Sequence, residues 1–241
     1  MDNFDFMCFS ETKVDFLDKE DLPSGLNVIT KRKISRELKL GGYHGLCVIF
    51  KDTYSDAVKQ LECGLTADSV LWLFINERVL GFSFILGCVY IPHEGSKYHT
   101  SDIFETISDD IVYLKGRYDA PICLTGDFNS RIGKLDDFME NDFFEIEESI
   151  VTPSPRNSQD DTVNDNGKRL LDMCKTLNMF IVNGRLGLDA HVGKLTCANS
   201  SVIDYCIVTD DPYSSINDFI VDDFEKLMSD KHNPICLCLK H

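Results

Sequence analysis

Basic residues are scarce in this sequence, and their scarcity limits what it can bind. The 241 residues include 24 Lys and Arg against 40 Asp and Glu, which gives a formal net charge of −16. A protein that gains affinity by neutralising many phosphates is usually basic. The charge therefore argues against tight non-specific binding to DNA unless positive charge is concentrated locally. One concentration stands out, at residues 31–39, and it is interpreted either as a solvated face or as a nucleic-acid contact.

Long apolar segments are also missing. No stretch reaches the roughly 18 residues that a membrane-spanning helix needs. The first residues, Met1 to Asp5, are acidic where a secretory signal would be basic and then apolar. These absences predict an intracellular protein with no membrane partner.

Cysteine pairs with C-x-x-C spacing are absent as well. The ten cysteines are scattered singly except for Cys236 and Cys238, and none forms a C-x-x-C pair. Most lie in apolar runs, where a free cysteine packs as a small hydrophobic residue. This usage argues against a zinc site or a disulfide framework and favours structural thiols in a reducing compartment.

What the sequence does contain is a series of short apolar runs with a few helical stripes between them. The runs predict strands at residues 4–12, 46–50, 70–75, 82–91, 179–182, 202–208 and 235–239. Apolar residues at helical spacing predict helices over 103–114 and 170–177, the second one preceded by Gly167. No repeat or linker interrupts the pattern, so residues 1–241 are predicted to form one domain of layered sheets with outer helices.

The stretch from Pro121 to Ser130 combines a buried strand with polar residues at its end. The apolar run Ile122–Leu124 ends at Gly126 and is followed by Asp127 and Asn129. Residues two apart in extended geometry leave the same face of a strand. A carboxylate and a carboxamide placed there can hold a water molecule beside a phosphate or a metal. The other interpretation is an ordinary Asx turn that closes the strand.

Polar residues also occupy other strand ends where packing alone would prefer apolar ones. The positions that share this property are Glu11, Tyr90, Asp127 with Asn129, Asp204, and Asp230 with His232. Carboxylates gathered at one edge repel each other unless a hard divalent cation lies among them, and Mg²⁺ prefers oxygen ligands. A histidine beside an aspartate can move a proton near neutral pH. The set predicts metal-assisted hydrolysis of a phosphate ester, although each residue singly also suits a buried hydrogen-bonded Asp or a loop His.

The motifs around these positions resemble those of the endonuclease/exonuclease/phosphatase superfamily. The resembling segments are Thr125–Asn129, Ile203–Tyr205 and Ser229–His232. The chain is most similar to the apurinic/apyrimidinic endonuclease-like domain of non-LTR retrotransposons. That similarity is carried by Gly87–Pro92, Gly126–Gly133, Asn166–Asp172, Ile181–Arg185 and Ser201–Val208. It extends from about residue 4 to residue 240 in the same motif order.

The resemblance implies a fold, an activity and a partner. The fold is an α+β, deoxyribonuclease-I-like, four-layer αββα sandwich of two packed mixed β-sheets with outer helices. The activity is Mg²⁺-dependent hydrolysis of phosphodiester bonds, with Mn²⁺ as a substitute. The partner is nucleic acid, DNA in particular, bound weakly because of the net charge, by a monomeric enzyme.

The resemblance also assigns roles to the reacting residues. Tyr90 matches an active-site tyrosine near the phosphate. Asp127 matches the aspartate that positions or deprotonates the attacking water, and Asn129 matches its partner. Asp204 matches the aspartate that orients a histidine, and His232 matches that histidine, which binds the scissile phosphate.

Two further residues are implied as metal ligands, and the chain departs from the family pattern near both. Glu11 matches the metal-binding glutamate, but the family's preceding strand, which bears an Asn, is missing before it. The chain is therefore predicted to be N-terminally truncated, with an unpaired sheet edge. Asp230 matches the last metal-side aspartate, but Lys231 separates it from His232, which implies a bulge or altered roles. No reverse transcriptase follows His241, as in a fragmentary or domesticated mobile-element domain.

These observations leave three hypotheses. The first is a Mg²⁺-dependent endonuclease-like phosphodiesterase. The second is a catalytically impaired remnant of a retrotransposon endonuclease domain that keeps only the fold, which the net charge and the missing strand favour. The third is a phosphatase acting on a lipid or inositol headgroup, for which the sequence shows no basic headgroup pocket.

Overall fold

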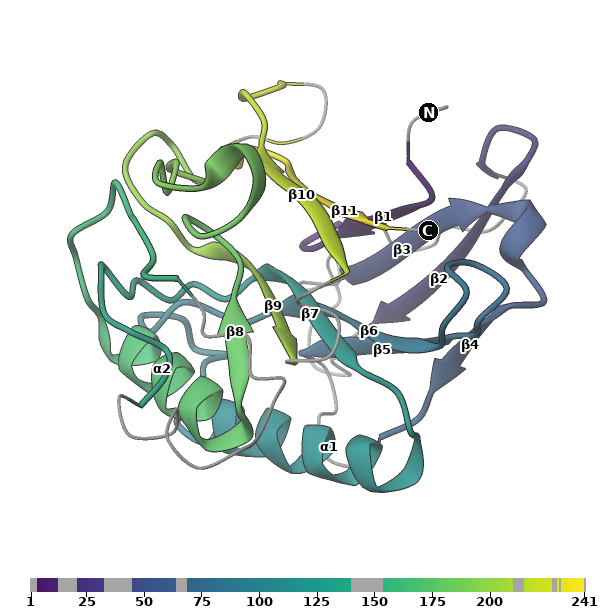
Figure 1. Cartoon of the computed structure of the whole chain (residues 1–241), viewed down its shortest axis with the longest axis horizontal. Helices are drawn as coiled ribbons and strands as arrows, with labels where there is room; N and C mark the ends of the chain where they lie inside the picture. The colour runs from purple at the N-terminus through teal and green to yellow at the C-terminus, as the bar shows by residue number, and fades with distance from the viewer. Residues whose placement is uncertain are drawn as a thin grey trace.

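In a computed structural model, the described residues form two packed β layers and a helical layer (Figure 1). The structure describes residues 4–12, 21–32, 45–63, 69–139, 154–209, 215–226, 229 and 231–240.

The central layer is a six-stranded mixed sheet with strand order β4-β5-β6-β7-β9-β8. Its strands are β4 (Val58–Leu61), β5 (Val70–Ile75), β6 (Phe84–Tyr90), β7 (Ile122–Asp127), β8 (Met179–Ile181) and β9 (Asp204–Thr209). Strands β6 and β7 run parallel, and the other neighbours pair antiparallel. Every residue of β6 and β9 is buried, as expected for strands that are covered on both faces.

Two α-helices pack on one face of this sheet, below it in Figure 1. Helix α1 spans Ile103–Arg117 and helix α2 spans Asp165–Leu177. Two short 3₁₀ turns, η2 (Asp52–Tyr54) and η3 (Gly187–Asp189), lie elsewhere. Gly167 was expected to precede the second helix, but it lies inside α2, because Asn164 caps the helix by accepting a hydrogen bond from the Gly167 amide. A Cβ on Gly167 would lie 1.9 Å from the Arg131 carbonyl oxygen, so close packing requires glycine there.

The opposite face of the central sheet is covered by two smaller antiparallel sheets. One has strand order β1-β3-β2, with β1 (Phe6–Phe9), β2 (Leu26–Arg32) and β3 (Gly45–Lys51). The other pairs β10 (Ile216–Val221) with β11 (Ile235–Leu239). Apolar side chains from both sheets and from the central sheet form the second hydrophobic core. The predicted α+β sandwich of packed sheets is therefore confirmed.

Strands β2, β4 and β10 were not predicted from the sequence. Each carries polar or charged residues among its apolar ones, for example Lys31 in β2, Lys59 in β4 and Asp218 in β10. These strands gain their partners from neighbours in the sheet, and that pairing overrides a weak local pattern. Of the basic cluster at 31–39, Lys31 and Arg32 belong to β2, and the other basic residues, Lys33, Arg36 and Lys39, lie outside the described residues.

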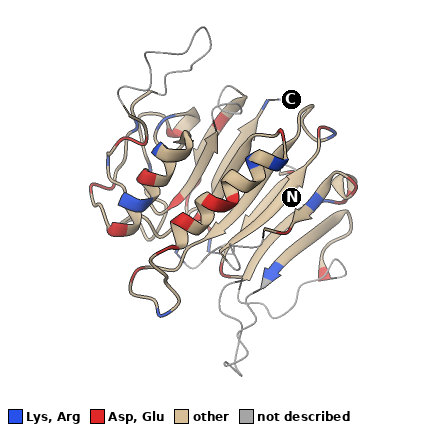
Figure 2. Cartoon of the chain, turned by 90° about the horizontal axis from the view of Figure 1, so that it is seen from below, with Lys and Arg blue, Asp and Glu red and all other residues tan. Residues whose placement is uncertain are grey.

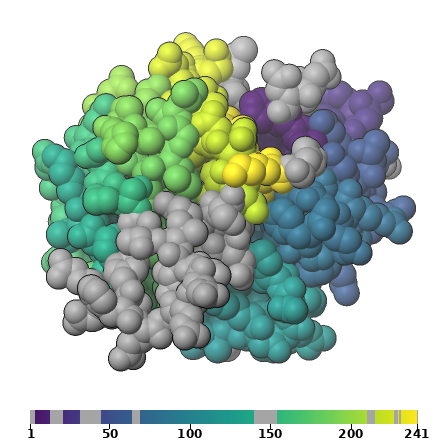
Figure 3. Space-filling model, viewed as in Figure 1, coloured from purple at the N-terminus to yellow at the C-terminus, as the bar shows by residue number. Residues whose placement is uncertain are grey.

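Red and blue segments, which mark acidic and basic residues, occur on the helices and loops, whereas the strands of the sheets are mostly tan (Figure 2). Neither α1 nor α2 is long and apolar enough to cross a bilayer, and the same holds for every other helix in the part of the chain that is described. The C-terminal segment, yellow in Figure 3, shares one face of the molecule with the N-terminal segment, purple in the same view.

Candidate active site

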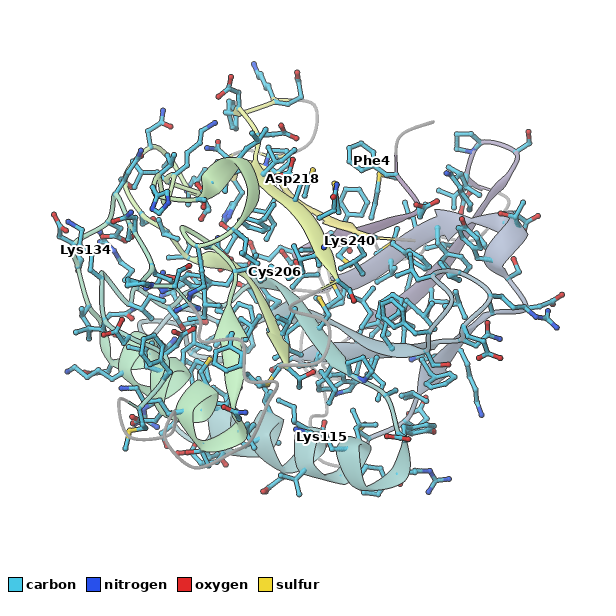
Figure 4. All side chains as sticks on the ribbon, in the orientation of Figure 1. Phe4, Lys115, Lys134, Cys206, Asp218 and Lys240 are labelled. Carbon is cyan, nitrogen blue, oxygen red and sulfur yellow. The ribbon has the colours of Figure 1, made fainter. Side chains whose placement is uncertain are left out.

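Strand register places three of the expected site residues side by side. In the β7–β9 pair Asp127 lies directly opposite Asp204, and in the β6–β7 pair Tyr90 lies beside Asp127. Because neighbouring strands are about 5 Å apart, these side chains line one end of the central sheet. Cys206, on the same face of β9 as Asp204 two residues away, lies near the middle of the molecule in Figure 4.

Asn129 is fixed to Asp127 by an Asx turn at the end of β7. The Asn129 backbone amide donates to Asp127 Oδ1 at 2.8 Å, and its side-chain Nδ2 donates to Asp127 Oδ2 at 3.1 Å and to the Ile91 carbonyl at 2.9 Å. Asn129 has a left-handed backbone conformation, which asparagine tolerates well. The turn interpretation and the site interpretation are thus compatible, because the turn is what points both side chains the same way.

His232 is oriented by Asp204. Its Nδ1 shares hydrogen bonds of 3.0 and 2.9 Å with the two carboxylate oxygens of Asp204. Thr196 Oγ1 accepts hydrogen bonds from the backbone amides of Ile203 and Asp204 and so holds the start of β9. With Nδ1 bonded to Asp204, Nε2 is the ring nitrogen that can face a substrate, and the Cys197 Sγ atom lies 3.8 Å from it.

The intervening Lys231 needs no strand bulge. Residues 231–234 precede β11 and lie outside any strand, so the alternation of side chains along a strand does not apply to them. Ser229 Oγ accepts hydrogen bonds from the backbone amides of Lys231 and His232, which form a tight turn. Asp230 lies outside the described residues.

Glu11 reaches this end of the sheet from the other layer. It follows β1, and its carboxylate accepts a hydrogen bond from the Tyr90 hydroxyl. It is also close enough to raise the pKa of Asp127. The structure therefore brings together six of the seven expected residues, namely Glu11, Tyr90, Asp127, Asn129, Asp204 and His232.

Burial and crowding shift the proton affinities in this cluster. Burial, followed by the neighbouring Asp204 carboxylate, raises the pKa of Asp127 well above that of a free carboxyl group. The hydrogen bond to Asp204, and then the one to Cys197, raises the pKa of His232. Burial and the Glu11 hydrogen bond raise the pKa of Tyr90. All three groups are therefore shifted towards their protonated forms in the metal-free site.

A divalent cation fits this donor set. Ligand atoms of Asp127, Asp204 and His232 lie within 4.8 Å of one another, and the Glu11 carboxylate adjoins them through Tyr90. The donors are mostly carboxylate oxygens, which hard cations such as Mg²⁺ prefer. Because Asp204 already holds His232, we consider the Glu11 and Asp127 carboxylates better placed to face a cation than the His232 ring.

Several supporting residues were not predicted from the sequence. Asn164 Oδ1 accepts from the Arg131 amide at 2.8 Å, and its Nδ2 donates to the Asn129 carbonyl at 3.2 Å, so the α2 cap also braces the site loop. Arg131 forms a bidentate pair with the buried Asp160 carboxylate, whose Oδ2 also accepts from the Val202 amide. The helix-capping pattern could have revealed Asn164, whereas the sequence carries no signal for the Arg131–Asp160 pair.

Comparisons with known proteins identify the fold. No protein-family model and no curated protein matches the sequence. Many solved structures do match in three dimensions. The AP endonuclease LMAP from Leishmania major is 14% identical with a TM-score of 0.65, over 98% of this chain and 78% of that one. The 3' phosphatase NExo from Neisseria, bound to a product DNA hairpin, is 14% identical with a TM-score of 0.61, over 98% and 89%.

A mobile-element protein has the same fold. The endonuclease domain of TRAS1, a telomere-specific non-LTR retrotransposon, is 14% identical with a TM-score of 0.53, over 89% of this chain and 80% of that one. The chain thus has the deoxyribonuclease-I-like fold shared by nucleases and phosphatases of the endonuclease/exonuclease/phosphatase superfamily, as its motifs indicated. At this identity the likeness establishes the fold alone.

Proposed function

We propose that this protein is a divalent-metal-dependent phosphodiesterase that cleaves nucleic acid, with Mg²⁺ as its natural ion and Mn²⁺ as a substitute. The observation that carries the proposal is the juxtaposition of the Asp127–Asn129 turn, the Asp204–His232 pair and the Glu11–Tyr90 contact at one end of the sheet. The structural neighbours with this fold are nucleases and phosphatases, which supports hydrolysis of a phosphate ester.

Each residue has a distinct task in this reaction. Asp127 accepts the proton of the attacking water, a role suited to a carboxylate whose pKa is raised by burial. The Asn129 amide holds that water against Asp127. His232 presents Nε2 to the phosphate, because Asp204 holds Nδ1, and a protonated ring stabilises the developing negative charge.

The metal would be held by Glu11 beside the Asp127 carboxylate, and the family resemblance adds Asp230 as a further ligand. Bound there, it supplies Lewis-acid polarisation of the phosphate and charge neutralisation. Tyr90 keeps the Glu11 carboxylate in place through its hydroxyl. We also propose a mobile-element origin, which the sequence motifs and the retrotransposon endonuclease fold support.

The alternative is a catalytically impaired remnant of such a domain. It is favoured by the division of the second β layer, where no hydrogen-bonded strand joins β1 to β11 among the described residues. A domain that lacked a strand there could keep its fold and lose efficient chemistry. The same assay decides between the two functions.

The test is nicking of supercoiled plasmid in the presence of Mg²⁺ or Mn²⁺, with EDTA as the metal-free reference. We expect the wild-type protein to nick only with metal. Asp127→Asn and His232→Ala should each lower the rate by about 100-fold or more, since general-base and electrostatic contributions have that size. Asp172→Asn, on the exposed face of α2, serves as the matched control and should keep the wild-type rate.

Circular dichroism of each variant separates loss of chemistry from loss of fold. Metal-independent nicking, or nicking that survives both site substitutions, would contradict the assigned roles. A folded wild-type protein that does not nick with either metal would contradict the nuclease function and favour the remnant.

A further inference from the structure

A thiol lies directly against the histidine of the candidate site. The Cys197 Sγ atom is 3.8 Å from His232 Nε2 and shares a hydrogen bond with it. His232 Nδ1 is bonded to Asp204. Cys197, His232 and Asp204 therefore form a thiol–imidazole–carboxylate series.

The backbone holds Cys197 in this place from two sides. Its amide donates to the Ser201 carbonyl at 3.0 Å, and the Ser201 amide returns a bond to the Cys197 carbonyl at 3.3 Å. The next amide, of Ala198, donates to the Lys231 carbonyl at 2.8 Å, which pairs this turn with the residue before His232. These backbone hydrogen bonds thus fix the position of Cys197 beside His232.

Exposure distinguishes Cys197 from the other thiols. Six of the ten cysteines are buried, Cys8, Cys197 and Cys236 are half-buried, and Cys238 is exposed. Cys236 hydrogen-bonds to Asp222, away from the site. In the part of the chain that the structure describes, Cys197 alone among the half-buried and exposed thiols hydrogen-bonds to an expected site residue.

We propose that Cys197 lines the phosphate position and is a covalent modification site. Small electrophiles that react with its thiol would block the candidate active site. A group attached to Sγ occupies the space in front of His232 Nε2, the nitrogen assigned to the phosphate. The effect on catalysis rests on the proposed function, whereas the reactivity of the thiol and its contact with His232 do not.

The chemistry can be followed with methyl methanethiosulfonate. The Cys197 sulfur attacks the thiomethyl sulfur, a new S–S bond forms, the bond to the sulfonyl sulfur breaks, methanesulfinate leaves and the thiol proton passes to solvent. Dithiothreitol restores the thiol by disulfide exchange. A peroxide would act at the same atom: the O–O bond breaks, the sulfur becomes a sulfenic acid and water leaves.

The experiment compares the wild-type protein with Cys197→Ala and with Cys238→Ser, the matched control at the exposed thiol. Methyl methanethiosulfonate labelling is followed by peptide mass mapping, by the His232 ring resonance in NMR spectra, and by plasmid nicking. Each nicking rate is expressed relative to the same protein untreated.

In the wild-type protein we expect Cys197 to be labelled about tenfold or more faster than the buried Cys123 and Cys206, because accessible thiols react first. Labelling should shift the His232 resonance and lower nicking about tenfold or more, reversibly with dithiothreitol. Cys238→Ser should behave in the same way, and Cys197→Ala should lose both the shift and the inhibition.

Three results would overturn the inference. The first is a Cys197 that stays unlabelled while Cys238 reacts. The second is a labelled Cys197 with an unmoved His232 resonance. The third is inhibition that persists in Cys197→Ala. If the wild-type protein does not nick DNA at all, the proposed function fails, and the labelling and NMR results still decide the position of Cys197.

Discussion

At the scale of the residue, the surroundings of Asp127 disfavour ionisation of its carboxyl group. Only 4% of its surface is exposed, and it faces Asp204 across the β7–β9 pair. A buried carboxylate beside another is costly to ionise. This arrangement favours a base that is active near neutral pH, and it lowers the stability of the metal-free fold.

The cost predicts a pH-dependent effect of Asp127→Asn. Because the folded-state pKa of Asp127 is raised, the folded protein holds this proton more tightly than the unfolded chain does. The bound proton contributes its full stabilisation below the pKa of Asp127 in the unfolded chain, near 4. This stabilisation is lost as the pH rises through the pKa of Asp127 in the folded protein. We expect the free energy of unfolding of Asp127→Asn, relative to that of the wild type, to rise by about 1 kcal/mol or more between pH 5 and pH 8. Urea unfolding in EDTA measures this difference. An equal difference at both pH values would contradict the assigned cause.

At the scale of the element, the start of α2 connects helix stability to the site. Asn164 accepts from the Gly167 amide as a helix cap, and it also bonds to Arg131 and Asn129 in the loop after β7. The Asn164 side chain therefore caps helix α2 and also holds the loop that carries Asn129.

This connection predicts that Asn164→Ala acts on stability and activity together. Loss of the cap should lower the free energy of unfolding by about 1–2 kcal/mol, and plasmid nicking should fall because Asn129 loses its brace. Thr176→Ala, exposed near the end of the same helix, is the control for both measurements. A stability loss with an unchanged nicking rate would show that Asn129 is held sufficiently by Asp127 and Ile91.

At the scale of the whole molecule, the net negative charge opposes the binding of a polyanionic substrate. The net charge is −16, and several basic groups are neutralised within the fold. These pairs are Arg131 with Asp160, Lys168 with Asp165, and Lys194 with Asp223. These pairs reduce the number of basic groups that can displace counterions from nucleic acid.

We therefore expect a weak salt dependence. A protein that makes 6–10 phosphate contacts loses about 10³–10⁵ in affinity between 50 and 200 mM salt. For this protein, the nicking rate at low substrate concentration should change by less than about tenfold over that range. A steep loss would contradict this expectation and would mean that many basic residues contact the substrate.

The sequence by itself determined the local features of this protein. Apolar runs marked most strands of the central sheet, helical spacing marked α1 and most of α2, and Gly126–Asn129 marked the turn at the end of β7. These follow from periodicity and turn chemistry, which act over a few neighbouring residues. The residue types at strand ends also predict metal-assisted phosphate chemistry.

Only the tertiary structure decided which of these residues meet. The register that places Asp127 opposite Asp204, the contact of Glu11 with Tyr90 and the approach of Cys197 to His232 all join segments far apart in the chain. Strands β2, β4 and β10 likewise appear only through their sheet partners. Burial, proton affinity and mutual distance depend on the packing of the two β layers, and a local pattern does not encode that packing.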